Sequence, residues 1–498
     1  MKATRSLYIL IPRNSYSIIK KQVAYGGYAL KKNGELVSGK LKYNDVEFTF
    51  VFDGKELRLI PPQEESCQTE SDLITISHIM QDPLKIDVPF LKGVCYENGH
   101  HYIFLTQIGE LIGSKNAILF INVLGYIKGR SSIDKICKMS FSSPELNCIY
   151  PVNQVLEYNC NRKKLSETGV FSIRTSDFAS TTTEKKAFIV DEKKVMVSFG
   201  ISRGFSTKVN EPPVSINSSM SFTFDPTSDY KFIMRLWRIA KEFICFLCYR
   251  KNVTWPKTNI SIPFKDGKTI QIGDLYITGE HQEEELETLE KGRFIKRQYI
   301  ESCEELILSD LAQNLLYTRH IPDSYNSGRY INASRFIMIT AAFEWEFHRR
   351  YPNGVPKKES TVQLEMQAEE EIQKLISTSS GKLKKKFQFL KKLIKSDSLQ
   401  TEIIKLGEDF DSIIGEFGHH LYEINNEKLN YNEMGKRIAD QRNHFAHGDL
   451  DKDFIGTSLL DLMYMEYIVY ALQLKKYDVA NDDIRKAIND LFGLGLNL

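Results

Sequence analysis

Side chains suited to handling phosphate and protons gather in the stretch IADQRNHFAHGDLD, Ile438 to Asp451. Arg442 carries a permanent charge and a planar fork of N–H donors that fits phosphate oxygens. The imidazole of His447 can gain or lose a proton near neutral pH, so it suits proton transfer. With Asn443 as a small polar aligner, these residue types favour attack of an RNA 2′-hydroxyl on the adjacent phosphodiester. That reaction needs neither a metal nor a protein nucleophile.

Helical spacing predicts how these side chains are presented. The stretch NYNEMGKRIADQRNHFAHG predicts a helix that ends at Gly448, a residue type common just past helix ends. Asp440, Asn443 and His447 then share one face, where Asn443 could align the imidazole. Arg442 lies about 140° around the helix from His447. The helix C-terminus also favours a charged imidazole at His447.

One chain supplies only one arginine and one histidine of this kind. A two-fold dimer that packs two such helix ends together would bring two arginines and two histidines into one cleft. We therefore expect a homodimer formed through the helical part of the chain.

The segment RNHFAH, Arg442 to His447, resembles the R-(polar)-x-x-x-H motif of HEPN-domain ribonucleases. Proteins of that family are helical bundles that commonly dimerise and cleave RNA without metal. The upstream segment NASRFIMITAAFEWEF resembles the first conserved helix of one HEPN branch. A β-rich region followed by such a bundle is similar to an anti-phage branch of the family. The resemblance implies that Arg442, Asn443 and His447 are catalytic.

Three further residues are auxiliary candidates. Asp440 could act through Asn443, and Glu344 could be an internal polar partner of Arg442 or only a rim carboxylate. His444 lies two residues from Arg442 on another face, so it is either an auxiliary site residue or a packing histidine. The pair His419 and His420 is interpreted as a helix end without chemistry.

A basic amphipathic helix is predicted for GKLKKKFQFLKKLIK, which carries seven lysines around a stripe of Leu383, Phe387, Leu390 and Ile394. The stripe favours a core-facing helix with a solvated lysine face. The alternative is an RNA-backbone contact through Lys384, Lys385 and Lys392, which would add salt-dependent, sequence-neutral affinity.

The rest of the chain predicts an α+β multidomain protein. Residues 1–225 contain short apolar runs separated by Asn33-Gly34 and Asp53-Gly54 turns, which indicates an antiparallel, sandwich-like domain. Residues 226–297 are predicted to add a helix, a hairpin turning at Asp266-Gly267 and an acidic linker. From 298 to 498 the apolar residues recur at helical spacing, which predicts an all-α, HEPN-like ribonuclease domain.

Composition sets limits on function. The net charge of the 498 residues is only +2, so contact with nucleic acid must use a local patch. Eight scattered cysteines do not look like a disulfide framework, and Cys245 and Cys248 are interpreted as buried thiols on an apolar helix. No apolar run reaches the roughly 20 residues of a membrane span. We expect a cytoplasmic protein that needs no metal or cofactor and does not bind membranes.

The predicted function is a HEPN endoribonuclease of antiviral defence by abortive infection. It would cut host RNA, with tRNA as one plausible target, after the N-terminal half binds a phage-derived trigger. The alternative is a non-catalytic HEPN dimerisation scaffold whose β-rich half binds a ligand or partner, since fold alone never establishes activity.

Overall fold

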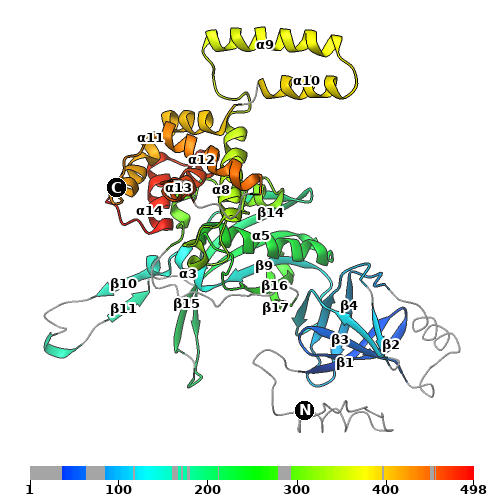
Figure 1. The fold of residues 1–498 in the computed structure, drawn as a ribbon. Coiled ribbons are helices and arrows are strands. Elements are labelled where there is room, and N and C mark those ends of the chain that lie inside the picture. The colour runs from blue at the N-terminus through cyan, green and yellow to red at the C-terminus, as the bar shows by residue number, and fades with distance from the viewer. Residues whose placement is uncertain are drawn as a thin grey trace, which may run out of the picture. The chain divides into compact units, whose positions relative to one another are not determined.

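The computed structural model describes residues 36–62, 85–110, 112–115, 118–159, 166–169, 172–175, 180–210, 212–278, 293–394, 397–448, 454 and 456–497. Antiparallel strands dominate the first part of the chain and helices the last part (Figure 1), which confirms the predicted α+β class. The Asn33-Gly34 turn and the acidic linker lie outside the described residues.

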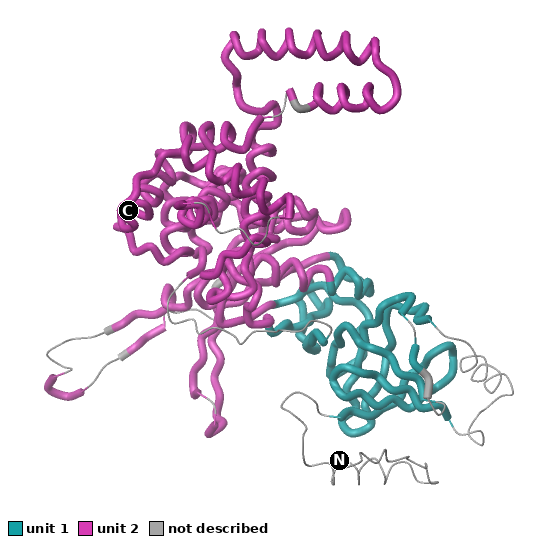
Figure 2. The backbone as a smooth tube through the Cα atoms, viewed as in Figure 1, with its two compact units in different colours: residues 1–140, 225–234, 257–282 teal, residues 141–224, 235–256, 283–498 magenta. Residues whose placement is uncertain are grey.

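The chain divides into two compact units, each assembled from separate stretches (Figure 2). The first comprises residues 1–140, 225–234 and 257–282, and the second comprises residues 141–224, 235–256 and 283–498. Strands of the predicted N-terminal domain therefore occur in both units, and those after residue 140 belong with the helical bundle.

The first unit is built on an antiparallel sheet with the strand order β16-β17-β8-β5-β4-β1-β2-β3-β7-β6. Its core collects the alternating aromatic residues of β2, Phe48, Phe50 and Phe52, with Phe104 of β5 against Phe50 at a centroid distance of 5.2 Å. The strands are β1 (Val37–Tyr43), β2 (Val46–Phe52), β3 (Glu56–Ile60), β4 (Phe90–Cys95), β5 (His101–Leu105), β6 (Gly113–Lys115), β7 (Ile118–Asn122), β8 (Gly125–Gly129), β16 (Lys257–Pro263) and β17 (Thr269–Ile277).

Both predicted hairpin turns inside the described residues are confirmed. Asp53-Gly54 joins β2 to β3, where Gly54 has φ 96° and Asp53 accepts a hydrogen bond from the Glu56 amide at 2.8 Å. Asp266-Gly267 joins β16 to β17 with φ values of 60° and 70°. These left-handed conformations are the ones that tight hairpins require.

The second unit begins with short elements and a long hairpin that precede its helices. The strand β14 pairs with β12, β13 and β15, and β10 pairs with β11. The elements are α3 (Pro144–Ile149), η2 (Val152–Val155), β10 (Leu156–Asn159), β11 (Ser172–Thr175), β12 (Ser180–Thr182), β13 (Lys186–Val190) and β14 (Lys193–Phe205). Three elements run across the unit boundaries: β9 (Ile136–Ser142), β15 (Val214–Thr227) and α5 (Tyr230–Cys248).

Helix α5 buries the apolar face expected of it. Its N-cap is Asp229, whose carboxylate accepts from the Phe232 amide at 3.1 Å. Cys245 and Cys248 are buried free thiols, and burial raises the pKa of Cys248 well above its usual value.

The helical bundle is centred on α13, which is buried along most of its length and packs against α8, α11, α12 and α14. Helices α11 and α12 approach closely at glycines, since a Cβ at Gly407 would meet the Tyr431 ring at 2.5 Å. The elements are η4 (Arg297–Tyr299), α6 (Glu304–Ala312), α7 (Tyr325–Gly328), α8 (Ala333–Arg350), α9 (Glu359–Thr378), α10 (Gly381–Ile394), α11 (Leu399–Glu423), α12 (Tyr431–Ala446), α13 (Ser458–Lys476) and α14 (Asn481–Phe492).

Helices α9 and α10 form a hairpin that projects from the bundle (Figure 1) and pack mainly on each other. Among the described residues, no helix is both long enough and apolar enough to cross a bilayer.

Candidate functional site

Helix α12 carries the predicted motif, and contacts at its start and near its middle fix it. The side chain of Asn430 caps its start by accepting from the amides of Asn432 and Glu433. Arg437 donates from Nε and Nη2 to the buried carboxylate of Asp461 on α13, at 2.7 and 2.8 Å. Such a bidentate pair fixes geometry as well as adding energy, so α12 is held firmly against the bundle core.

The last turn of α12 is fixed by an aromatic contact. Phe445 is buried between Phe336 and Phe454, with ring centroids 5.5 and 5.4 Å away. The helix ends at Ala446, the His447 amide donates to the carbonyl of Asn443 at 3.1 Å, and Gly448 has φ 94°. The predicted end of the helix at Gly448 is therefore confirmed. With Phe445 facing inward, the neighbouring residues face solvent.

Arg442 is held by a carboxylate from another helix. Its Nη2 lies 3.0 Å from Oε2 and 3.3 Å from Oε1 of Glu344, near the middle of α8. Both side chains are partly exposed. Only Nη2 makes this contact, so Nε and Nη1 keep N–H donors that no described residue takes up. A guanidinium anchored at one nitrogen and open at two can still bind a phosphate.

Asp440, Asn443 and His447 are all exposed, as expected for residues on one face. Within the described part of the chain, their side chains make no hydrogen bond or ion pair, so the predicted contact between Asn443 and the His447 ring is absent from this structure. His444 is half-buried. The structure thus presents Arg442 in a defined position and His447 as an open imidazole at the helix end.

The sequence-based prediction does not include His348 and Glu402, which form a contact near Glu344. His348, one turn later on α8, places Nε2 2.8 Å from Oε1 of Glu402 in the first turn of α11. The His348 side chain is 62% exposed, whereas that of Glu402 is 4% exposed. Burial raises the pKa of Glu402, and the negative charges of Glu344 and Asp397 add to the rise, while His348 opposes it.

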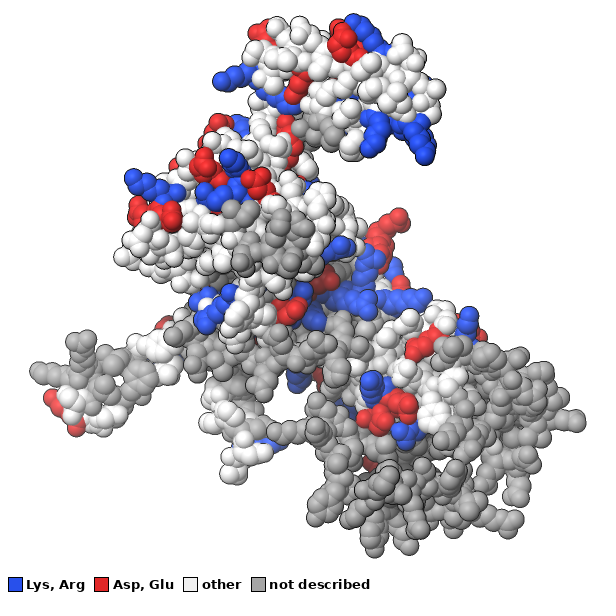
Figure 3. Space-filling model, viewed as in Figure 1, with Lys and Arg blue, Asp and Glu red and all other residues white. Residues whose placement is uncertain are grey.

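Helix α10 does not face the bundle core, contrary to the favoured interpretation of its apolar stripe. It packs along α9, and Leu383 and Leu390 remain exposed. Lys391 pairs with Glu369 of α9 at 3.2 Å, whereas Lys384, Lys385 and Lys392 are exposed. Figure 3 shows basic side chains on the surface of the α9–α10 hairpin. Lys395 lies outside the described residues.

Charge reversal tests whether this helix binds RNA. Changing Lys384, Lys385 and Lys392 together to Glu is expected to weaken RNA binding and to lower the slope of log K against log salt by about 2, since each lost phosphate contact on a single strand removes about 0.7. The measurement is a binding titration at several salt concentrations. The matched control reverses three exposed lysines of the first unit, Lys257, Lys265 and Lys268. If the two triple variants bind RNA with the same affinity and the same salt slope, the lysines of α10 do not contact RNA and form only a solvated face.

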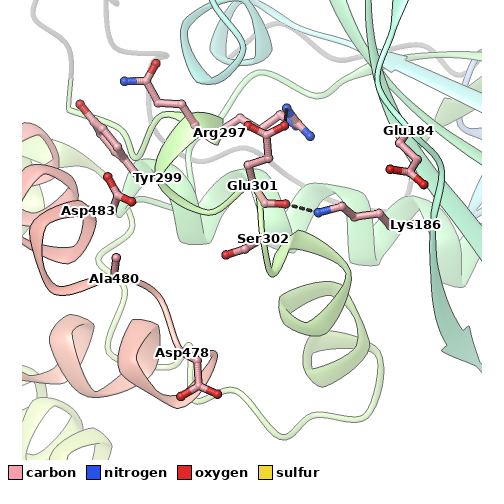
Figure 4. Close-up of a pocket in the computed structure, with 10 residues that line it drawn as sticks. Glu184, Lys186, Arg297, Tyr299, Glu301, Ser302, Asp478, Ala480 and Asp483 are labelled. Atoms are coloured by element: carbon pink, nitrogen blue, oxygen red, sulfur yellow. Dashed lines mark hydrogen bonds and ion pairs between the residues drawn. The ribbon is translucent and has the colours of Figure 1, made fainter.

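The second unit also contains a cavity of about 530 Å³ (Figure 4), and none of the predicted site residues lines it. Its two cations are already neutralised, because Arg297 Nε lies 2.8 Å from the buried Glu304 carboxylate and Lys186 lies 3.6 Å from Glu305. The lining is otherwise acidic and polar, which does not suit a phosphate. It consists of Glu184, Lys186, Arg297, Gln298, Tyr299, Glu301, Ser302, Asp478, Ala480 and Asp483.

Comparisons of the chain with protein-family models, curated proteins and solved structures find no match. The chemistry of the α8–α12 surface therefore carries the functional inference.

Proposed function

We propose that the chain is a metal-independent endoribonuclease of the HEPN type that acts in anti-phage defence by abortive infection. Its architecture resembles that of the anti-phage HEPN protein ApeA. The observation that carries the proposal is the C-terminal end of α12, where Arg442 is held by Glu344 but keeps free N–H donors, and His447 is solvent-exposed five residues later. A cation for phosphate and an imidazole for protons are the groups that the reaction needs.

In this mechanism Arg442 grips a non-bridging phosphate oxygen and stabilises the charge of the crowded phosphorane. Glu344 contacts only Nη2 of Arg442, so it orients the guanidinium and leaves the donors on Nε and Nη1 for the phosphate. His447 moves a proton at the reacting phosphodiester, and Asn443 aligns the substrate or the ring. Host RNA is the proposed substrate, and the β-rich part of the chain is proposed to bind a phage-derived trigger.

The test is cleavage of RNA, tRNA included, by purified protein in EDTA. Products are expected to end in a 2′,3′-cyclic phosphate or its ring-opened form, because the 2′-oxygen is the nucleophile. Ends that carry a 3′-hydroxyl would overturn the mechanism. No cleavage of any RNA by the wild-type protein, with or without phage lysate, would instead favour the non-catalytic dimerisation scaffold.

The role of Glu344 gives a separate prediction. Changing Glu344 to Ala is expected to lower the cleavage rate about fivefold, because a partly exposed ion pair that positions Arg442 is worth about 1 kcal/mol. The control is Glu427→Ala, which removes an exposed carboxylate from the loop after α11. A faster Glu344→Ala enzyme would contradict this role and would mean that the carboxylate competes with phosphate for Arg442.

A further inference from the structure

His348 and Glu402 form a pair that the proposed mechanism leaves unused. The imidazole is largely open to solvent, while the carboxylate beneath it is almost fully buried and sits in the first turn of α11. Glu402 Oε1 accepts from His348 at 2.8 Å, and Oε2 has no hydrogen-bond partner among the described residues. The buried carboxylate is therefore directed at one imidazole, which leaves the other ring nitrogen of His348 facing outward.

The pair belongs to the same surface as Arg442. Glu344 binds Arg442 and lies four residues before His348 on α8, and residues with this spacing are neighbours, with Cβ atoms about 5–6 Å apart. Helix α12 packs against both α8 and α11, so the contact of Glu344 with Arg442 and the contact of His348 with Glu402 join the same three helices. Helices α8, α11 and α12 thus bring an arginine and a carboxylate-bound imidazole to one strip of surface.

The chemistry of RNA cleavage requires two proton transfers. As the 2′-oxygen bonds to phosphorus, its hydroxyl proton must go to a base, and as the bond from phosphorus to the 5′-oxygen breaks, that oxygen must receive a proton from an acid. One imidazole cannot hold both roles in a concerted step. His447, the exposed imidazole at the C-terminal end of α12, is then left for the acid role.

Resting on the proposed function, we propose that His348 is the base that takes the 2′-hydroxyl proton, with Glu402 as its positioning residue, while His447 protonates the departing 5′-oxygen. A buried carboxylate behind an imidazole fixes the ring and its tautomer and stabilises the imidazolium that forms. Two other carboxylates act on Glu402, namely Glu344 of α8 and Asp397, and Asp397 is itself paired with Lys357 at 3.4 Å. The acid therefore comes from α12 and the base from α8.

The experiment compares two substrates in single-turnover cleavage by the full-length protein. One is ordinary RNA, and the other carries a 5′-bridging sulfur at the mapped cleavage linkage, a leaving group that needs no acid. His348→Gln, whose amide can still donate to Glu402, is expected to slow both substrates by about 10²- to 10⁴-fold. His447→Ala is expected to slow only the ordinary RNA.

The variant Glu402→Gln provides a second measurement, the pH–rate profile, which would not change if Glu402 only stabilised the fold. It is expected to slow both substrates less than His348→Gln does and to shift the acidic limb of the pH–rate profile, with the melting temperature followed in parallel. His419→Ala, which removes an exposed histidine from α11, is the matched control and is expected to cleave at the wild-type rate.

The outcomes distinguish a failure of the His348 assignment from a failure of the proposed ribonuclease function. If His348→Gln cleaves both substrates at the wild-type rate while Arg442→Ala does not, the His348 base is overturned and the ribonuclease stands. If His348→Gln, like His447→Ala, is rescued by the sulfur leaving group, the assignment of His348 as the base is overturned. If the wild type and Arg442→Ala are equally inactive, the proposed function fails and the base assignment fails with it.

Discussion

Replacing His447 with Ala is expected to lower the rate of RNA cleavage by about 10²- to 10⁴-fold, the usual contribution of a general acid or base. Replacing Arg442 with Ala is expected to cost about 10²- to 10³-fold, as for loss of one preorganised donor to a developing charge. Both side chains are at least partly exposed on α12, so neither change opens a cavity in the core. Asn443→Ala is expected to have a milder effect, because it aligns rather than reacts.

The measurement is initial rate on a defined RNA, together with toxicity on induction and a thermal melt of each variant. Lys436→Ala removes an exposed cation from the same helix and serves as the control for Arg442. Losses smaller than tenfold in both Arg442→Ala and His447→Ala, with folded proteins, would contradict the catalytic assignment.

Local pattern predicts the elements that depend on near neighbours. The helix that ends at Gly448 and the Asp53-Gly54 hairpin follow from residues within one turn of each other. The β1–β2 turn was missed because it uses Asn44 and Asp45, at φ 49° and 62°, where glycine is the usual signal. Asn and Asp tolerate this left-handed conformation, so the dipeptide itself was the available clue.

Local sequence pattern does not predict contacts between segments that are distant in the chain. Glu344 and Arg442 are 98 residues apart, and His348 and Glu402 are 54 apart, so no periodicity relates them. The contact of Glu344 with Arg442, one of the two interpretations of Glu344, was suggested by the resemblance of its helix to a HEPN helix and not by spacing. The four-residue spacing of Glu344 and His348 on α8 was visible, but its meaning depends on which helices pack beside it. The apolar stripe of α10 likewise predicts an amphipathic helix without showing that α9, rather than the bundle core, lies against it.

The assembly of two chains is the prediction with the largest consequence for the site. Arg442 reaches back to Glu344 on α8, while His447 caps the far end of α12 on the exposed face. Five residues apart, the two side chains are directed about 140° from each other around the helix. A single chain is therefore poorly arranged for one phosphate to meet both. A two-fold axis through two α12 ends allows the arginine of one protomer to serve the histidine of its partner.

A heterodimer of Arg442→Ala and His447→Ala protomers tests this arrangement. Coexpression with two different tags and purification on both isolates the mixed dimer, in which one of the two shared sites is complete. Roughly half of the wild-type activity is expected, since a two-fold dimer holds two equivalent sites. Each parental homodimer should stay inactive under the same conditions. A mixed dimer as inactive as its parents would mean that both groups act from one chain, and a wild-type protein that is monomeric yet fully active at nanomolar concentration would refute the shared site.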